Sequence, residues 1–135
     1  MNSDNWAETE EDEMADVKQV IVIRKDLKMR RGKEIAQGAH ASMAFLAKKA
    51  LAREEFTPAE RAWLEGLFTK VCVRVDSEEQ LLAVAKAAEA AGVQAEVITD
   101  SGKTEFGGVP TKTCLAVGPD LASKVDAVTG GLELY

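Results

Sequence analysis

The chain has 135 residues, of which 46% are hydrophobic and 30% charged, the composition of one soluble globular domain. Its net charge is −6, yet residues 1–17 hold seven acidic side chains and no basic one, so the remainder has a net charge of +1. The polar, acidic start does not resemble a signal peptide, and no apolar run approaches the ~20 residues that a membrane span needs. These features predict a cytoplasmic protein with no membrane partner.

Residues 1–17 form the first predicted segment. They are polar and acidic without apolar periodicity, which predicts a disordered tail. The folded domain is then expected to cover residues 18–135. It begins with a β-branched run at residues 18–24, typical of a strand buried on both faces.

A basic loop follows this strand. Residues 18–33 carry seven basic side chains against a single acid, Asp26, although the whole chain is acidic. Because the local field decides where a phosphate binds, this loop is a candidate anion-binding segment. A solvated surface loop is the ordinary alternative, but the direct junction with a polar helical face favours anion binding.

That helix is expected from about residue 32 to residue 53. At about 100° per residue, Lys33, Gln37 and His40 fall within a narrow arc. The opposite side carries apolar side chains: Ile35, Ala39, Met43 and Leu46. We therefore expect the apolar side to be buried, and the other side to present an amine, an amide and the chain's only imidazole as a site.

The remaining elements alternate between helices and strands. They are a short helix at 58–67 with a capping box, a strand at 71–75, a helix between Ser77 and Gly92, strands at 94–99 and 113–117, and a last helix to about 128. The order β-α-α-β-α-β-β-α predicts a single α/β domain. Its sheet should be four-stranded and mixed, mostly parallel, with helices on both faces.

Two polar segments should meet at one edge of this sheet. Ligands collect at the carboxyl ends of parallel strands, and both the basic loop and Asp100 follow such ends. If the first and third strands are parallel and near neighbours, Lys33, His40, Asp100 and Thr104 share one edge. Such groups are sufficient to position a water and stabilise an oxyanion. The alternative for Asp100 is a turn residue that caps Gly102.

Familiar catalytic motifs are absent from the sequence. It contains no G-x-S-x-G elbow, no second histidine for a metal pair and no complete phosphate-binding loop. Cys72 and Cys114 lie in strand-like runs, which predicts buried, reduced thiols and not a disulfide framework or metal site. We therefore expect neither a metal nor a cofactor.

Four blocks stand in order between about residue 18 and the end of the chain. They are Arg24-x-Asp26-Leu27-x-Met29-x-x-Gly32-Lys33-x-x-Ala36-Gln37-x-x-His40-Ala41, Asp100-x-Gly102-x-Thr104, residues 113–119 and residues 128–135. Together they resemble the signature of the type 2 peptidyl-tRNA hydrolases. The resemblance implies a compact α/β homodimer that cleaves the ester between a peptide and the 3′ end of tRNA without a metal.

The resemblance also implies a set of site residues. The expected catalytic residues are Lys33, His40, Asp100, Thr104 and Thr113. In our hypothesis Asp100 orients or deprotonates a water, Lys33 stabilises the oxyanion or a terminal phosphate, His40 holds the lysine or the water, and the threonines donate hydrogen bonds. The residues expected to bind substrate are Arg24, Asp26, Lys28, Arg30, Arg31 and Gln37. The basic ones would hold the tRNA backbone without reading its sequence.

Several positions depart from the family pattern. The loop at residues 104–111 is not of the commonest form, Ser101 and Gly131 replace frequent alanine and histidine residues, and the helix near residues 57–67 looks added. Two other functions therefore stay open: a non-catalytic module that binds tRNA or a protein, and a hydrolase of another acyl ester. The acidic tail is either solubilising or folds back on the basic loop, in which case deleting residues 1–16 should tighten tRNA binding.

Overall fold

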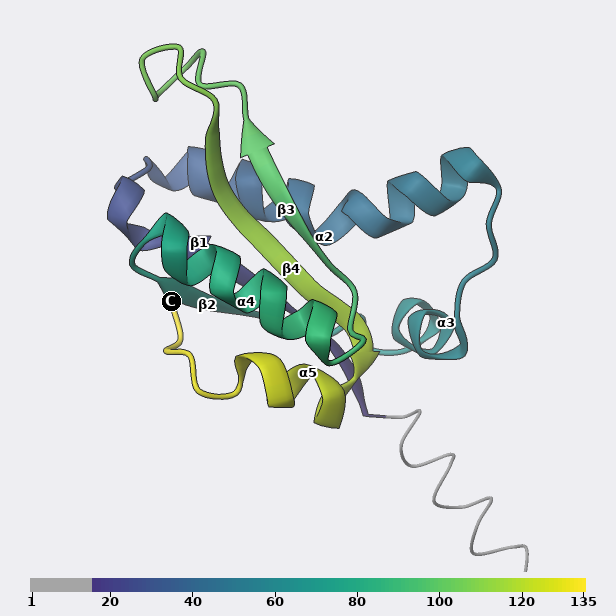
Figure 1. Cartoon of the computed structure of the whole chain (residues 1–135). Coiled ribbons are helices and arrows are strands. Elements are labelled where there is room, and N and C mark those ends of the chain that lie inside the picture. Colours follow the sequence, from purple (N-terminus) through teal and green to yellow (C-terminus); the bar gives the residue numbers. More distant parts are fainter. Residues whose placement is uncertain (1–15) are drawn as a thin grey trace, which may run out of the picture.

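The computed structural model describes residues 16–135 (Figure 1). Nearly all of the predicted acidic tail lies outside the described residues. The elements in chain order are β1 (Val17–Arg24), the 3-10 turn η1 (Lys25–Leu27), α2 (Arg31–Ala52), α3 (Pro58–Glu65), β2 (Lys70–Val75), α4 (Glu78–Ala90), β3 (Ala95–Asp100), β4 (Thr111–Leu121) and α5 (Ala122–Thr129). None of these helices has the length and apolar character that crossing a membrane requires.

The four strands form one mixed sheet in the order β2-β1-β4-β3. Strands β1 and β2 are parallel, whereas β4 is antiparallel to both of its neighbours. The expected four-stranded mixed sheet is confirmed, but its description as mostly parallel is wrong. No helix separates β3 from β4, so the chain returns beside β3 in the opposite direction. Strands β1 and β3 still run the same way, and their carboxyl ends share one edge on either side of β4.

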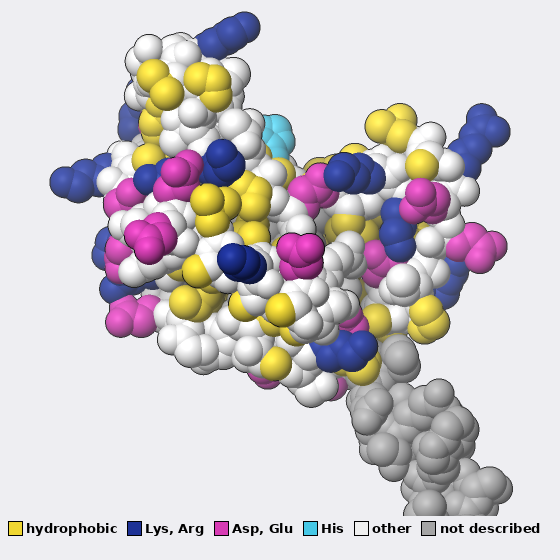
Figure 2. All heavy atoms as spheres, viewed as in Figure 1, with side chains coloured by type: hydrophobic (Ala, Val, Ile, Leu, Met, Phe, Trp, Pro, Cys, Tyr) yellow, Lys and Arg dark blue, Asp and Glu magenta, His cyan; other side chains and the backbone are white. Residues whose placement is uncertain are grey.

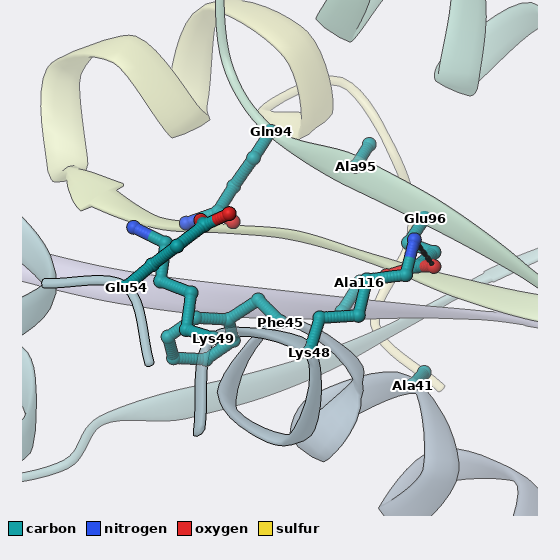
Figure 3. A pocket seen from close by; sticks show the side chains of 10 residues that line it. Ala41, Phe45, Lys48, Lys49, Glu54, Gln94, Ala95, Glu96 and Ala116 are labelled. Atoms are coloured by element: carbon teal, nitrogen blue, oxygen red, sulfur yellow. Dashed lines mark ion pairs between the residues drawn. The ribbon is translucent and has the colours of Figure 1, made fainter. Parts of the chain in front are cut away.

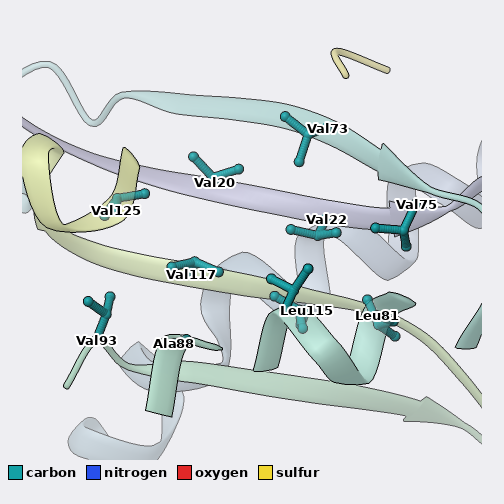
Figure 4. Close-up of a cluster of buried hydrophobic side chains, with 11 residues drawn as sticks. Val20, Val22, Val73, Val75, Leu81, Ala88, Val93, Leu115, Val117 and Val125 are labelled. Atoms are coloured by element: carbon teal, nitrogen blue, oxygen red, sulfur yellow. The ribbon is translucent and has the colours of Figure 1, made fainter. Parts of the chain in front are cut away.

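Helices cover both faces of the sheet, as expected (Figure 1). On one face, α4 and α5 pack over alternate residues of the strands and enclose the larger core cluster (Figure 4). Its members include Val20, Val22, Leu81, Leu115 and Val125. The odd-numbered residues of β1, such as Ile21 and Ile23, point to the other face and pack in a second cluster with Ala41 of α2.

The buried side of α2 differs from the prediction. Ile35 and Met43 are 67% and 57% exposed, whereas the buried residues are Gln37, Gly38, Ala41, Ser42 and Phe45. Small residues let the helix approach the sheet closely: a side chain at Gly38 would sit 3.8 Å from Ile21. The apolar residues of α2 therefore predict the wrong buried side. The side that is buried contains Gln37 and Ser42, whose polar groups form hydrogen bonds with Thr113 and Gln19.

The cysteines are both free, and the prediction that both are buried is wrong for one of them. Cys114 is fully buried in the central strand β4. Cys72 lies on β2, the edge strand of the sheet, and is exposed.

Helix α3 begins as its capping box predicts, with Thr57 and Glu60 bonding each other's backbone N–H. The Glu60 carboxylate is only 1% exposed and also accepts hydrogen bonds from Lys49 of α2 and from Gln94. Trp63 is fully buried and donates from Nε1 to the Thr69 carbonyl at 2.7 Å. This helix is therefore anchored to the end of α2 and to the residues that immediately precede β2 and β3.

Candidate active site

The shared carboxyl edge of β1 and β3 brings three predicted residues together. Lys33 lies in the first turn of α2, Asp100 ends β3, and Thr104 belongs to the loop that follows. Lys33 Nζ donates to Asp100 Oδ1 at 2.8 Å and to Thr104 Oγ1 at 2.9 Å. The Lys33 and Asp100 side chains are only 15% and 12% exposed, so this ion pair is protected from bulk water.

Two buried residues, Gln37 and Thr113, hold Asp100 in place from the interior of the protein. Gln37, one turn after Lys33 in α2, donates from Nε2 to Asp100 Oδ1 at 3.3 Å. Its Oε1 accepts a hydrogen bond from the hydroxyl of Thr113, a fully buried residue of β4. Because the Thr113 proton goes to Oε1, the amide of Gln37 is oriented with its N–H toward Asp100.

Asp100 makes a third kind of contact through its other oxygen. Oδ2 accepts the backbone N–H of Gly102 at 2.9 Å. The turn role that the sequence offered as an alternative is thus present together with the Lys33 contact. The hydrogen bonds from Lys33 and from the Gly102 N–H hold the pKa of Asp100 below its ordinary value.

The group keeps unused hydrogen-bonding positions. An ammonium has three N–H donors, and Lys33 uses two of them on Asp100 and Thr104. A carboxylate offers about four acceptor positions, and Asp100 uses three. The hydroxyl of Thr104 accepts from Lys33, so its own proton is available to another group. The site can therefore bind an anionic oxygen and a water at adjacent positions.

His40 lies apart from these hydrogen bonds. It shares the predicted arc of α2 with Lys33 and Gln37, but it is exposed and no hydrogen bond joins it to the other site residues. The predicted contact between His40 and Lys33 is absent. The three residues lie at the margin of the buried side of α2. Gln37 is on the buried side of this margin, whereas His40, three residues later, faces solvent.

Arg24 and Asp26, predicted to bind substrate, bind each other. The Arg24 guanidinium donates to both carboxylate oxygens of Asp26, at 3.2 and 2.7 Å, and to the Lys112 carbonyl at 3.0 Å. The Arg24 side chain is 11% exposed. This pair fixes the end of β1 against the start of β4.

The other predicted basic residues lie at the surface. Lys28, Arg30 and Arg31 are exposed around η1 and the start of α2. Figure 2 shows several lysine and arginine side chains on the left of the view, where these elements lie. They form an exposed basic surface at the start of α2.

Sequence reasoning missed two residues of the site. Glu105 accepts Arg30 Nε at 2.8 Å and ties the β3–β4 loop to the start of α2. Cys114 donates from Sγ to the Gln37 carbonyl, and burial raises the pKa of this thiol to about 11, so it is not a nucleophile at neutral pH. Glu105 adjoins Thr104 and Cys114 adjoins Thr113, so adjacency to a predicted site residue was the available signal for both.

Within residues 16–135, no group of three or more histidine, cysteine, aspartate or glutamate side chains is arranged to hold a metal ion.

Two of the hollows that lie away from the Lys33 group border α2. One, of about 290 Å³, opens between the end of α2 and the start of β3, the opposite end of that strand from Asp100 (Figure 3). Its polar residues include Lys48, which pairs with Glu96. The other is an apolar groove of about 600 Å³ between the exposed flank of α2 and β2, and we call it the α2–β2 groove. It is lined by Ile21, Ile23, Glu34, Ile35, Gly38, Ala39, Ser42, Met43, Leu46, Phe68, Lys70, Cys72 and Tyr135.

Comparison with known proteins gives a consistent result. A model of the family described as peptidyl-tRNA hydrolase PTH2 matches residues 17–135. Proteins named peptidyl-tRNA hydrolase are similar over most of the chain. The one from Haloquadratum walsbyi is 38% identical over 119 residues, covering 88% of this chain and all of the relative. Those from Methanopyrus kandleri and Nanoarchaeum equitans are 42% and 43% identical, covering 87% and 88% of this chain and 97% and 99% of the relatives.

Proposed function

This chain belongs to the peptidyl-tRNA hydrolase PTH2 family, and on that premise we propose that it hydrolyses the ester between a peptide, or an N-blocked amino acid, and tRNA. The products are free tRNA and the released peptide acid. The observation that carries the proposal at the site is the Lys33–Asp100 pair, which keeps one N–H and one acceptor position unused. A module that only binds tRNA has no need of such a pair.

Asp100 is proposed to orient the attacking water. Its remaining acceptor position takes one water proton, and this directs the water oxygen at the ester carbonyl. The lowered pKa of Asp100 makes it a weak base, so orientation is favoured over full proton removal at the start of the step. The water oxygen adds to the carbonyl carbon, and the bond from that carbon to the ribose oxygen then breaks. One water proton moves by way of Asp100 to the departing ribose oxygen, so that the acid and the tRNA hydroxyl are both formed.

Lys33 is proposed to stabilise the oxyanion. Its third N–H, beside the two that hold it in place, is available to the carbonyl oxygen as negative charge develops there. The free hydroxyl proton of Thr104 supplies a second donor. Gln37 and Thr113 are positioning residues in this scheme, because they are buried and act through Asp100.

Lys28, Arg30 and Arg31 are proposed to contact tRNA phosphates, because they are exposed next to Lys33. His40, also exposed, is proposed to contact the substrate and not to hold Lys33. Arg24 and Asp26 support binding indirectly, by fixing the end of β1 beside the basic residues.

The first experiment measures release of free tRNA from N-acetyl-aminoacyl-tRNA by the native protein and by Asp100→Ala. We expect turnover that is lost in the variant while tRNA binding persists. A native protein that binds tRNA without turnover would instead be a binding module. Turnover on a different acyl ester alone would identify another hydrolase.

We further propose that the protein is a homodimer formed through the α2–β2 groove. The groove exposes Ile35 and Met43, and apolar patches of this kind mark protein interfaces. It has Glu34 towards one end and Lys70 towards the other, so a two-fold contact places opposite charges together. Light scattering of the native protein should give twice the chain mass, and Met43→Asp should give the monomer. A monomeric native protein would contradict this.

The domain boundary and the location are proposals of the same kind. The catalytic domain is proposed to begin at residue 17 or 18, where β1 starts, with the acidic segment before it as a separate tail. A cytoplasmic location follows from the proposed substrate, because peptidyl-tRNA arises during translation. Fractionation of cells expressing a tagged chain tests the location.

A further inference from the structure

The loop between β3 and β4, residues 101–110, has a defined internal structure next to Asp100. The N–H of Gly108 donates to the Gly102 carbonyl at 2.9 Å, and that of Val109 donates to the Phe106 carbonyl at 3.0 Å. Gly102 has a φ of +81°, and a Cβ there would lie 2.0 Å from the Val109 carbonyl oxygen. The loop thus folds tightly on itself and projects beyond the sheet edge (Figure 1).

The same loop is attached to the start of α2 by two side chains. Thr104 accepts a hydrogen bond from Lys33, and Glu105 pairs with Arg30. The Glu105 side chain is only 13% exposed although it is charged. Because residues 104 and 105 are both held, the following residue, Phe106, has a fixed place relative to the ion pair of the site.

Phe106 is half-buried at this place. It packs against the core cluster that includes Met29 and Cys114, and the loop's hydrophobic side chains reach the surface at the top of the view (Figure 2). Lys33 Nζ lies over the ring, 5.9 Å from its centroid. This distance is at the outer limit of a cation–π contact, so the ring is an aromatic surface directly beside the ammonium of the site.

We propose that Phe106 is a stacking platform for the terminal base of tRNA. This inference rests on the proposed function, because the ester that is cleaved sits on the ribose of the terminal nucleoside. When the ester carbonyl lies at Lys33, the base attached to the same ribose lies close by. Phe106 offers an aromatic face there, and aromatic rings bind unpaired bases by stacking. Phe106 then determines specificity for a nucleoside ester over a simple ester.

A role of Phe106 in stacking can be distinguished from a role in core packing, because the two require different side-chain properties. Core packing needs apolar volume, which leucine supplies, whereas stacking needs an aromatic face, which tryptophan retains and leucine lacks. Phe106→Leu and Phe106→Trp therefore form a matched pair of variants. Thermal unfolding of both checks that each one folds.

The test measures KM and kcat for N-acetyl-aminoacyl-tRNA with the native protein and both variants. Loss of one stacked base should raise the KM of Phe106→Leu about tenfold, with kcat within about twofold of native. Phe106→Trp should keep a native KM. A native KM in Phe106→Leu, or an equal rise in both variants, would overturn the proposal.

A second readout uses adenosine, the nucleoside that ends tRNA, as the probe. Its proton NMR signals should broaden with native protein and with Phe106→Trp, but much less with Phe106→Leu. Equal broadening with all three proteins would contradict stacking. This measurement needs no turnover. An inactive native protein would thus refute the proposed function, while the adenosine signals would still decide the role of Phe106.

Discussion

Lys33 holds the central position among the site residues, because it binds Asp100 and Thr104 at once and keeps one donor for the substrate. Lys33→Met removes the charge while keeping much of the side-chain length. We expect kcat to fall by about 10²- to 10³-fold, the usual loss of one oxyanion donor. Measured turnover of N-acetyl-aminoacyl-tRNA tests this, with the exposed Lys86→Met of α4 as the matched control. A full rate in Lys33→Met would refute the proposed mechanism.

The ionisation of Asp100 gives a prediction in pH. Its pKa lies below the ordinary 3.8, first because of the Lys33 hydrogen bond and then because of the Gly102 N–H. Folding therefore favours the carboxylate. The resulting stability is fully present above the unfolded-state pKa and is lost as the pH falls through the lower folded-state pKa. Carbon-13 NMR should place the Asp100 titration below the ordinary value, and Lys33→Met should raise it. A titration at or above 3.8 in the native protein would contradict the ion pair.

At the scale of elements, the β3–β4 loop depends on Gly102. Alanine there meets the Val109 carbonyl oxygen and takes a positive φ, so the loop must move and the contact from Gly102 N–H to Asp100 is disturbed. The strain of about 1–3 kcal/mol destabilises the loop. We expect kcat/KM to fall roughly tenfold, because Asp100 loses one of the contacts that orient it. Gly107→Ala is the control, since its Cβ would meet nothing within 4 Å although its φ is also positive. Equal losses in the two variants would show that backbone conformation alone, and not the contact, matters.

Helix α3 offers a stability test far from the chemistry. Burial alone would raise the pKa of Glu60, but hydrogen bonds from Lys49, Thr57 and Gln94 outweigh it and lower the pKa. Glu60→Gln leaves Lys49 without its buried partner, which costs about 3 kcal/mol and lowers Tm by roughly 10 °C.

The same helix supplies the control for this change. Glu65 pairs with Arg61 at 3.3 Å, but both side chains are more than half exposed. Glu65→Gln should therefore change the stability by less than about 0.5 kcal/mol. Both variants should keep native kcat/KM, and an activity loss in Glu60→Gln at a temperature where it is folded would connect α3 to the site.

The elements also show what local sequence determines. The capping box at Thr57 and the Ser77 cap are signals within four residues, and both helices begin where these signals predict. Strand β4 runs further than predicted, from Thr111 to Leu121, because its start pairs with β3 and its end pairs with β1. Local signals located the elements well, whereas long-range pairing decided their extent.

At the scale of the whole molecule, the site was predictable in part. The contact between Lys33 and Asp100 was predicted because both residues follow the carboxyl ends of strands that run in the same direction. Strands β1 and β3 do run in the same direction, although β4 lies between them. The buried flank of α2 did not follow from its apolar periodicity, because hydrogen bonds to Thr113 and Gln19 make Gln37 and Ser42 its buried residues. Partners supplied by distant strands cannot be read from one helix.

Charge distribution gives the last prediction. Residues 1–15 contain six acidic side chains, and Asp16 should be retained because its carbonyl accepts the Ala122 N–H at 2.8 Å. Deleting residues 1–15 moves the net charge from −6 to zero, so less repulsion opposes the approach of tRNA to Arg30 and Arg31. We expect tighter tRNA binding at low salt and a difference that fades at an ionic strength of about 0.5 M, where screening is strong.

A full-length variant separates two causes of that effect, the loss of charge and the loss of length. Replacing the six acids by their amides keeps the length of the tail and removes its charge. If charge is the cause, this variant should bind tRNA as tightly as the deletion does, and filter-binding measurements across salt concentrations compare the two. If the native and the deleted chain bind tRNA equally tightly at low salt, the prediction is wrong. The affinity would then depend on the local basic surface and not on the net charge of the chain, and the acidic tail would be solubilising only.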